Sequence, residues 1–109
     1  MTKKRINSRQ KGAAGERELA NVLKEYGIDA RRGQQFSGGT DSPDVVVGGP
    51  LEGFHIECKR VESGNLYNWF EQAQRDAGSK TPVVVHRKSN KPWMAILTLD
   101  DLIQILTWR

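Results

Sequence analysis

The chain has 109 residues, of which 28% are charged and 37% are hydrophobic, a balance typical of a single soluble globular domain. Its 17 basic and 13 acidic side chains give a formal charge of +4, which favours a polyanionic partner such as nucleic acid without requiring one. The single cysteine excludes an intramolecular disulfide and, with no apolar run long enough to span a membrane, favours a cytoplasmic protein.

The chain begins with a basic segment, residues 1–11, that is nearly free of apolar side chains. We expect this segment to be a flexible basic arm, and a solubilising tail is the alternative. Apolar residues then recur at helical spacing from Gly12 to Tyr26, and Gly27 is well placed to end that helix. We therefore predict a single domain over residues 12–109.

Short strands and glycine-rich loops follow the first helix. The pattern predicts strands at IDARR, DVVVG and FHIECKRV, and a loop at GQQFSGGTDSP. LYNWFEQAQRDAG returns to helical spacing, PVVVHRK and PWMAILTL are two further strands around a turn, and LDDLIQILTW is a closing helix. The predicted order of an α/β fold is thus helix, three strands, helix, two strands and helix.

The third predicted strand, FHIECKR at residues 54–60, carries ionisable side chains at alternate positions. Because alternate side chains share one face of a strand, His55, Glu57 and Lys59 point one way and the other side chains point the opposite way. An edge strand with a solvated face explains this alternation without any chemistry. The tripeptide Glu-x-Lys does not decide the matter, since it arises easily by chance.

Asp44 adds a second acid to that polar face. It lies where the loop enters an apolar run, and a turn at GGPLEG would place it beside Glu57. Two adjacent carboxylates repel each other unless a cation lies between them, and Mg²⁺ prefers oxygen ligands. Lys59, two residues further along, could then position or deprotonate a water molecule. The constellation predicts a site that hydrolyses phosphodiesters.

Glu16 is a third candidate acid, on the first predicted helix. It shares the apolar stripe of Leu19 and Leu23, whereas Glu18 is turned about 200° away from it. An unpaired carboxylate on an apolar stripe is costly, so we expect Glu16 to face the metal, its waters or Lys59. The alternative is an acid in the first helical turn that the helix dipole favours.

Three segments together resemble the PD-(D/E)XK nuclease superfamily: KGAAGERELANVLKEYG, RRGQQFSGGTDSPDVVV and FHIECKRVE, with twelve residues between Asp44 and Glu57. Within it the chain is most similar to archaeal-type Holliday junction resolvases and to small resolvase-like endonucleases of bacteriophages. The resemblance runs from Lys11 to Leu106. It implies a restriction-endonuclease-like fold, with a central mixed β-sheet flanked by helices in the order α-β-β-β-α-β-β-α.

The resemblance also implies roles for individual residues. Asp44 and Glu57 match the metal-binding acids of the superfamily, and Lys59 matches its catalytic lysine. Glu16 matches the acid on the first helix of the resolvase branch, where it could reach the metal through a water. The backbone carbonyl of Cys58 would face the metal.

Further residues carry two interpretations each. The resemblance implies a functional serine before the second strand, for which Ser37 is the match and Ser42 a rival. Gln72 resembles a glutamine near the site in several branches, and a solvated helix position explains it equally well. Asp41 is better explained as a turn cap than as a metal ligand. His55 could touch DNA, but an ordinary strand-surface histidine is the favoured interpretation.

Basic side chains beside these segments are candidates for binding DNA phosphates. Arg31 and Arg32 adjoin the predicted catalytic loop, and there phosphate binding is favoured over simple solvation. The turn around SNK is also basic, and it either contacts phosphates or is solvated. The candidate DNA-binding residues are Lys11, Arg31, Arg32, Arg87, Lys88 and Lys91.

We therefore expect a Mg²⁺-dependent endodeoxyribonuclease, with Mn²⁺ able to substitute, that acts on branched DNA as a Holliday junction resolvase. A homodimer would place two sites about a two-fold axis, with apolar surface around Trp69, Phe70 or Trp108 for its contact. The alternatives are a phage endonuclease of the same fold that cuts flap, nicked or plain duplex DNA, and a DNA-binding module without cleavage.

Overall fold

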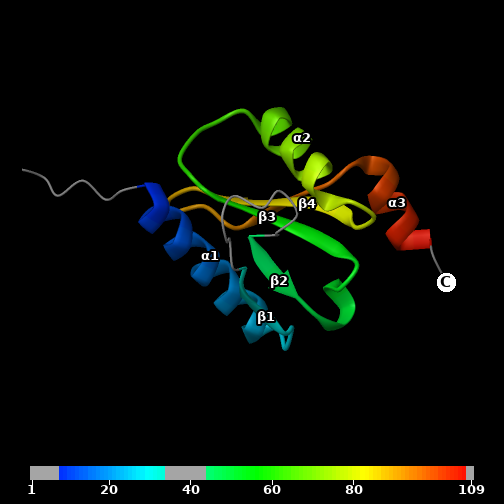
Figure 1. The fold of residues 1–109 in the computed structure, drawn as a ribbon, viewed down its shortest axis with the longest axis horizontal. Coiled ribbons are helices and arrows are strands. Elements are labelled where there is room, and N and C mark those ends of the chain that lie inside the picture. Colours follow the sequence, from blue (N-terminus) through cyan, green and yellow to red (C-terminus); the bar gives the residue numbers. More distant parts are fainter. Residues whose placement is uncertain (1–7, 34–43, 108–109) are drawn as a thin grey trace, which may run out of the picture.

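A computed structural model describes residues 8–33 and 44–107, with side chains from residue 12 onward within those ranges. The elements are α1 (Ser8–Glu25), β1 (Ala30–Arg32), β2 (Val45–Val47), the 3-10 turn η1 (Gly49–Leu51), β3 (Phe54–Arg60), α2 (Leu66–Ala77), β4 (Thr81–Arg87), β5 (Met94–Ile96) and α3 (Leu99–Thr107). This order is the predicted one (Figure 1). Several predictions lie outside the described residues, namely those on residues 1–7, the side chain of Lys11, Ser37, Asp41, Ser42 and Trp108.

The strands form one five-stranded mixed sheet in the chain order β1-β2-β3-β4-β5. Neighbouring strands are antiparallel except β3 and β4, which are parallel in a register that pairs Ile56 with Val83 and Glu57 with Val84. A parallel pair needs a crossover connection, and α2 provides it. The predicted α/β class with a central mixed sheet is therefore confirmed.

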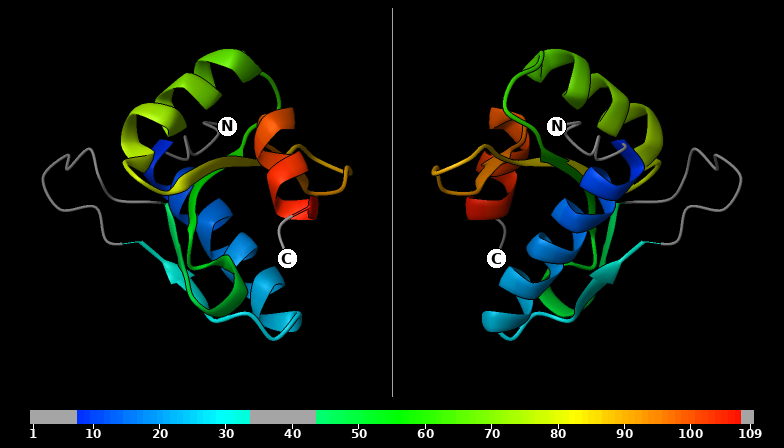
Figure 2. Two further views of the ribbon diagram at one scale, coloured as in Figure 1. Left: turned by 90° about the vertical axis from the view of Figure 1, so that its right-hand side faces the viewer. Right: turned by 90° about the vertical axis from the view of Figure 1, so that its left-hand side faces the viewer.

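The helices lie on both faces of the sheet. Figure 2 shows α1 in blue on one side of the strands and α2 in yellow-green on the other. Under α1 lies the main apolar core, in which Leu19 and Ala20 of the helix meet strand residues; the buried members are Leu19, Ala20, Ala30, Val45, Val47, Ile56 and Val83. The face under α2 is different, because small residues Ala73 and Ala77 are buried there beside polar groups of β3.

Local sequence explains where α2 starts and where α1 ends. The side chain of Asn65 accepts a hydrogen bond from the Asn68 backbone N–H at 3.0 Å and so caps the start of α2. Gly27 has a positive φ of 79°, and its N–H donates to the carbonyl of Lys24 at 2.9 Å. The predicted glycine stop of the first helix is therefore confirmed.

The start of α1 differs from the prediction. The helix begins at Ser8, so residues 8–11 belong to it and not to a basic arm that ends at residue 11. Arg, Gln and Lys are good helix formers, and the packed helix that follows extends through them. The glycines at 12 and 15 do not interrupt it.

Among the described residues, no helix is long and apolar enough to cross a membrane.

Gly15 is needed where α1 crosses β3. A Cβ added there would overlap the Cβ of Arg60 and lie 3.1 Å from its Cγ, whereas a Cβ at Gly12 would meet nothing within 4 Å. We expect Gly15→Ala to lower the free energy of unfolding by roughly 1–3 kcal/mol, since it overpacks this contact. Gly12→Ala is the matched control and should raise it by about 0.5–1 kcal/mol. Urea unfolding of both variants measures the difference, and equal stabilities would contradict the close approach.

Candidate active site

The polar face of β3 is buried, although its pattern is that of an exposed edge strand. Phe54 and Ile56 point into the core under α1, so the alternate side chains of His55, Glu57 and Lys59 point toward α2. His55 is 2% exposed and Glu57 is 3% exposed. The predicted separation of faces is confirmed, and the interpretation of a solvated edge strand is wrong because β3 is central and α2 covers it.

Asp44 lies directly before β2 and is fixed against β3 by two hydrogen bonds. Its backbone N–H donates to the carbonyl of Ile56 at 3.0 Å, and its Oδ2 accepts from the N–H of Cys58 at 2.8 Å. These two bonds lie on either side of Glu57 in the sequence of β3. The predicted neighbourhood of Asp44 and Glu57 is therefore present in the structure.

Burial and mutual repulsion alter the acidity of this group of carboxyls. Burial, followed by the negative charge of Glu57, raises the pKa of Asp44 from 3.8 to about 7, against the opposing hydrogen bond from Cys58. Burial also raises the pKa of Glu16, while Arg32 lowers it and Glu57 adds a smaller upward effect. Three acids thus share one region in which negative charge is costly, and a cation would relieve that cost.

Glu16 has a partner within the protein. The Nε of Arg32 donates to its Oε1 at 3.3 Å, and Glu16 is only 7% exposed although it belongs to α1. The inward orientation predicted from the helical stripe is confirmed. Its partner among the described residues is Arg32 and not Lys59, and Arg32 therefore neutralises an acid in addition to any contact with DNA.

A second ion-pair network joins α1 to the ends of β3 and β4. Glu18 accepts from Arg60 at 3.3 Å and also pairs with Arg87. Arg87 further donates from Nε to the carbonyl of Lys91 at 2.7 Å. The interpretation of Arg87 as part of a purely solvated or phosphate-binding turn therefore needs correction, since it anchors the sheet to α1. Glu18 lies off the face of α1 that carries Glu16, as its helical angle indicated, but it is held in ion pairs with Arg60 and Arg87.

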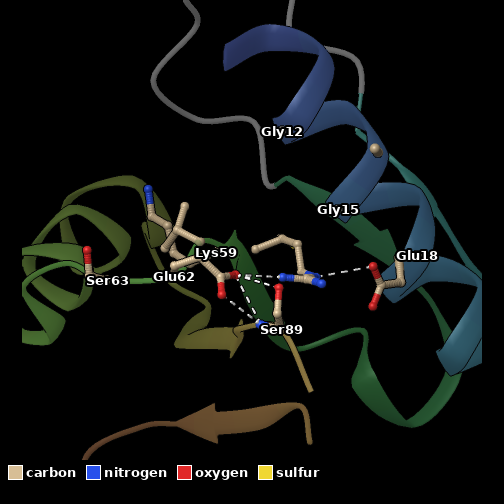
Figure 3. A pocket seen from close by; sticks show the side chains of 11 residues that line it. Gly12, Gly15, Glu18, Lys59, Glu62, Ser63 and Ser89 are labelled. Carbon is tan, nitrogen blue, oxygen red and sulfur yellow. Dashed lines mark hydrogen bonds and ion pairs between the residues drawn. The ribbon is translucent and has the colours of Figure 1, made fainter. Parts of the chain in front are cut away.

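A cleft lies between the N-terminal half of α1 and the end of β3 (Figure 3). Small residues of α1 form one wall, and Lys59, Ser63 and Ser89 contribute polar groups to the other. Glu62 holds Ser89 through both the backbone N–H and the Oγ, each at 3.0 Å. Cys58, whose N–H donates to Asp44, also lines this cleft. The cleft therefore adjoins the pair of Asp44 and Glu57.

Residues 7–109 match the model of a family described as "Phage putative PDDEXK endonuclease". The chain belongs to the PD-(D/E)XK endonucleases. A similar solved structure is that of Archaeoglobus fulgidus Hjc at 1.6 Å resolution, described as a Holliday junction resolvase from an archaeal hyperthermophile. It is 25% identical, has a TM-score of 0.58, and the match covers 80% of this chain and 72% of that one. No curated protein sequence matches.

These comparisons confirm the resemblance and the restriction-endonuclease-like fold of this endonuclease. Its other candidate DNA-binding residues have the exposure that phosphate contact requires: the side chains of Arg31, Lys88 and Lys91 are exposed. Gln72 is half-buried on α2, one turn before Asp76. Neither Trp69 nor Phe70 is fully exposed, and the ring of Trp69 packs 4.9 Å from that of His86.

His55 is the residue of this endonuclease that sequence reasoning misjudged most. It is not a strand-surface histidine, because its Nε2 lies 3.0 Å from Oε1 of Glu57 within the buried layer under α2. Asp76 joins them, with one ligand atom of each of the three residues within 4.8 Å of the others. Asp76 was not singled out from the sequence; a signal that could have found it is its place four residues after Gln72, which puts both on one face of α2.

Proposed function

We propose that this PD-(D/E)XK endonuclease is a Mg²⁺-dependent endodeoxyribonuclease that cleaves phosphodiester bonds in branched DNA, with four-way junctions as its preferred substrate. The observation that carries the proposal is the acid pair of half-buried Asp44 and buried Glu57: Asp44 is fixed by two bonds that flank Glu57, and its pKa is raised to about 7 by burial and by that neighbour. Such a pair is costly without a cation.

The donor atoms at this place fit a hard divalent cation. Asp44 and Glu57 supply carboxylate oxygens, and Glu16 could contribute through a water. In an extended strand the carbonyl of a residue projects to the same side as its N–H, so the carbonyl of Cys58 is directed to the side on which its N–H meets Asp44. When bound, Mg²⁺ or Mn²⁺ would polarise the phosphate and acidify a water.

The remaining roles belong to side chains near the acids. Lys59 is half-buried and lines the cleft, so its amine would orient the attacking water and offset charge on the scissile phosphate. Arg32 would favour the ionised form of Glu16 beside the acid pair, against the effect of burial. Ser37, in the segment outside the described residues, is proposed to contact the phosphate.

The substrate proposal has two supports. The similar solved structure is described as a Holliday junction resolvase, and the complete set of acids with Lys59 argues against a DNA-binding module that lacks cleavage. The description of the matched family as phage endonucleases favours one alternative, an enzyme of the same fold that cuts flap, nicked or plain duplex DNA. Either enzyme would act in the cytoplasm that holds the DNA.

One gel assay tests this proposal. Labelled four-way junction, flap, nicked duplex and linear duplex are incubated with the protein in Mg²⁺, in Ca²⁺ and in chelator. We expect cleavage only in Mg²⁺, and of the junction at least tenfold faster than of the linear duplex. Equal rates on all four DNAs would favour the general endonuclease, and junction binding without any cleavage in Mg²⁺ or Mn²⁺ would favour the binding module.

Binding is proposed to come mainly from phosphate contacts by the exposed cations. Arg31→Ala and Lys88→Ala should each weaken junction binding and flatten the dependence of log K on log salt by about one unit, because each removes one phosphate contact. Arg75→Ala, an exposed cation of α2, is the control. Mobility shifts at several salt concentrations measure the slopes, and slopes unchanged from the parent would place the DNA elsewhere.

We further propose a homodimer, with the contact on α3. Exposed apolar side chains gather on this helix, where no residue is buried and Leu99 and Leu106 are 71% and 70% exposed. The remaining ones on α3 and β5 are Met94, Leu102, Ile103 and Ile105. Such a surface would be covered by its own copy about a two-fold axis, which also supplies the two sites that paired cuts require.

The dimer proposal predicts a defined change in sedimentation. The parent should sediment as a dimer at micromolar concentration, and Ile103→Glu should convert it into a 12.3 kDa monomer because it places a charge in the contact. Tyr67→Glu, at an exposed site on α2, is the control and should remain a dimer. A parent that sediments as a monomer and still cuts both opposing strands would contradict the proposal.

A further inference from the structure

Glu57 has a buried neighbour to which the proposed chemistry gives no role. The Nε2 atom of His55 lies 3.0 Å from Oε1 of Glu57, and their side chains are 2% and 4% exposed. His55 is among the largest fully buried side chains of the described residues. Water therefore does not compete for this bond, and its geometry is set by the protein alone.

The chemistry of the two groups fixes the direction of the bond. Glu57 must be ionised to bind a cation, and an ionised carboxylate only accepts hydrogen bonds. With a cation bound, Nε2 of His55 would therefore carry the hydrogen and donate a hydrogen bond to Glu57. When Asp44 and Glu57 share a cation, Asp44 is ionised and cannot donate a hydrogen bond, so His55 then holds the Glu57 carboxylate by donation.

Asp76 places a second carboxylate near the imidazole, from a different element. One of its oxygens, a ring nitrogen of His55 and an oxygen of Glu57 all lie within 4.8 Å of one another. The ring thus sits between α2 and its own strand. A histidine and two carboxylates can also form a transition-metal site, but the direct bond to Glu57 already uses the Nε2 atom, so that only Nδ1 is left as a metal ligand.

We propose that His55, bonded to Glu57 and near Asp76, is a positioning residue that orients the Glu57 carboxylate to share a cation with Asp44. The inference rests on the proposed metal-dependent function and assigns no contact between His55 and the substrate. Metal-binding carboxylates are commonly fixed by a hydrogen-bonded partner, and removing such a partner typically weakens metal binding or activity by about 10–100-fold.

The test depends on which ring nitrogen of His55, Nε2 or Nδ1, makes the hydrogen bond to Glu57. The side-chain amide of Gln reaches about as far as Nε2 of histidine, whereas that of Asn reaches only as far as Nδ1. The Mn²⁺ dissociation constant of the DNA-free protein is measured by electron paramagnetic resonance. It should stay within about threefold of the parent in His55→Gln and rise about 10–100-fold in His55→Asn. The half-saturating Mg²⁺ concentration for cleavage should shift in the same order.

A control separates positioning from simple loss of packing. Val83→Ala removes buried methyl groups on the opposite face of the sheet, so it should lower stability and leave the Mn²⁺ constant unchanged. Equal Mn²⁺ binding by the parent and His55→Asn would overturn the proposal. A nitrogen coupling from His55 to bound Mn²⁺ would also overturn it, because His55 would then be a ligand.

Two further outcomes are distinguishable. If His55→Asn does not fold, Asp76→Asn tests the same arrangement from a half-buried helix position: weaker Mn²⁺ binding supports the proposal, and unchanged binding overturns it. If the parent binds Mn²⁺ but cuts no DNA, the nuclease function fails. The comparison of the Gln and Asn variants then still decides whether His55 positions Glu57.

Discussion

Asp44→Asn should abolish cleavage of a labelled four-way junction in Mg²⁺, with a loss of at least about 10³-fold, while junction binding survives. The amide retains the oxygen that accepts from Cys58 N–H, so the local backbone should keep its place. What is lost is one of the two carboxylates that would hold the cation. Lys59→Ala should lose cleavage to a similar extent, because the amine that would orient the water is gone.

The control for this result is Asp29→Asn. Asp29 is exposed and lies at the opposite end of the β1–β2 pair, where its carbonyl accepts from Gly48 at 2.9 Å. It should cut at the parent rate. Cleavage rates from time courses and mobility shifts for each variant measure both effects, and wild-type cleavage by Asp44→Asn would show that the site assignment is wrong.

For Glu57→Gln, an effect on folding must be separated from an effect on catalysis, because Glu57 is buried and bonded to His55. Removal of a group that faced solvent would leave the fold intact, but Glu57 is 3% exposed. The Gln oxygen can still accept from His55, so the variant should fold with the loss of one charge. Its thermal unfolding should therefore be measured beside its cleavage rate.

The second large effect is on the stability of the metal-free protein. The pKa of Asp44 is raised from 3.8 to about 7 in the folded state, so the folded protein binds the proton more tightly than the unfolded chain does. Its stability in chelator should therefore fall as pH rises from about 4 to 7, by up to roughly 4 kcal/mol, and stay low above that range. Mg²⁺ should restore the lost stability at pH 8.

Asp44→Asn should remove this pH dependence. The neutral amide carries no charge against Glu57, so the variant should be more stable than the parent in chelator at pH 8 and should gain nothing from Mg²⁺. Urea unfolding at pH 5 and pH 8, with and without Mg²⁺, gives the four free energies of unfolding to be compared for the parent and the variant. A parent whose metal-free stability rises between pH 5 and 8 would show that the acid pair is not strained by its own charge.

The main elements and the acid pair follow from local sequence signals. Asp44 was placed beside Glu57 because a loop entered an apolar run and a turn joined two strands, and both features depend only on neighbouring residues. The inward orientation of Glu16 followed from helical periodicity in the same way. The start of α1 was missed because basic residues that resemble a tail are also good helix formers.

Features that depend on distant segments were not predictable from these patterns. The burial of His55 arises because α2 crosses over β3, and alternation within one strand cannot show what covers its polar face. Arg60 and Arg87 meet Glu18 from 42 and 69 residues away in the sequence. Arg32 was expected to serve DNA, and its pairing with Glu16 depends on how β1 packs beside α1.

An anomalous difference map from crystals soaked in Mn²⁺ locates the cation of the proposed site without relying on activity. We expect a peak between the carboxylates of Asp44 and Glu57, with the carbonyl of Cys58 at ligand distance and His55 still bonded to Glu57. A peak coordinated by His55 and Asp76 on the other side of Glu57, or no peak at the acid pair when the protein is saturated with Mn²⁺, would contradict it.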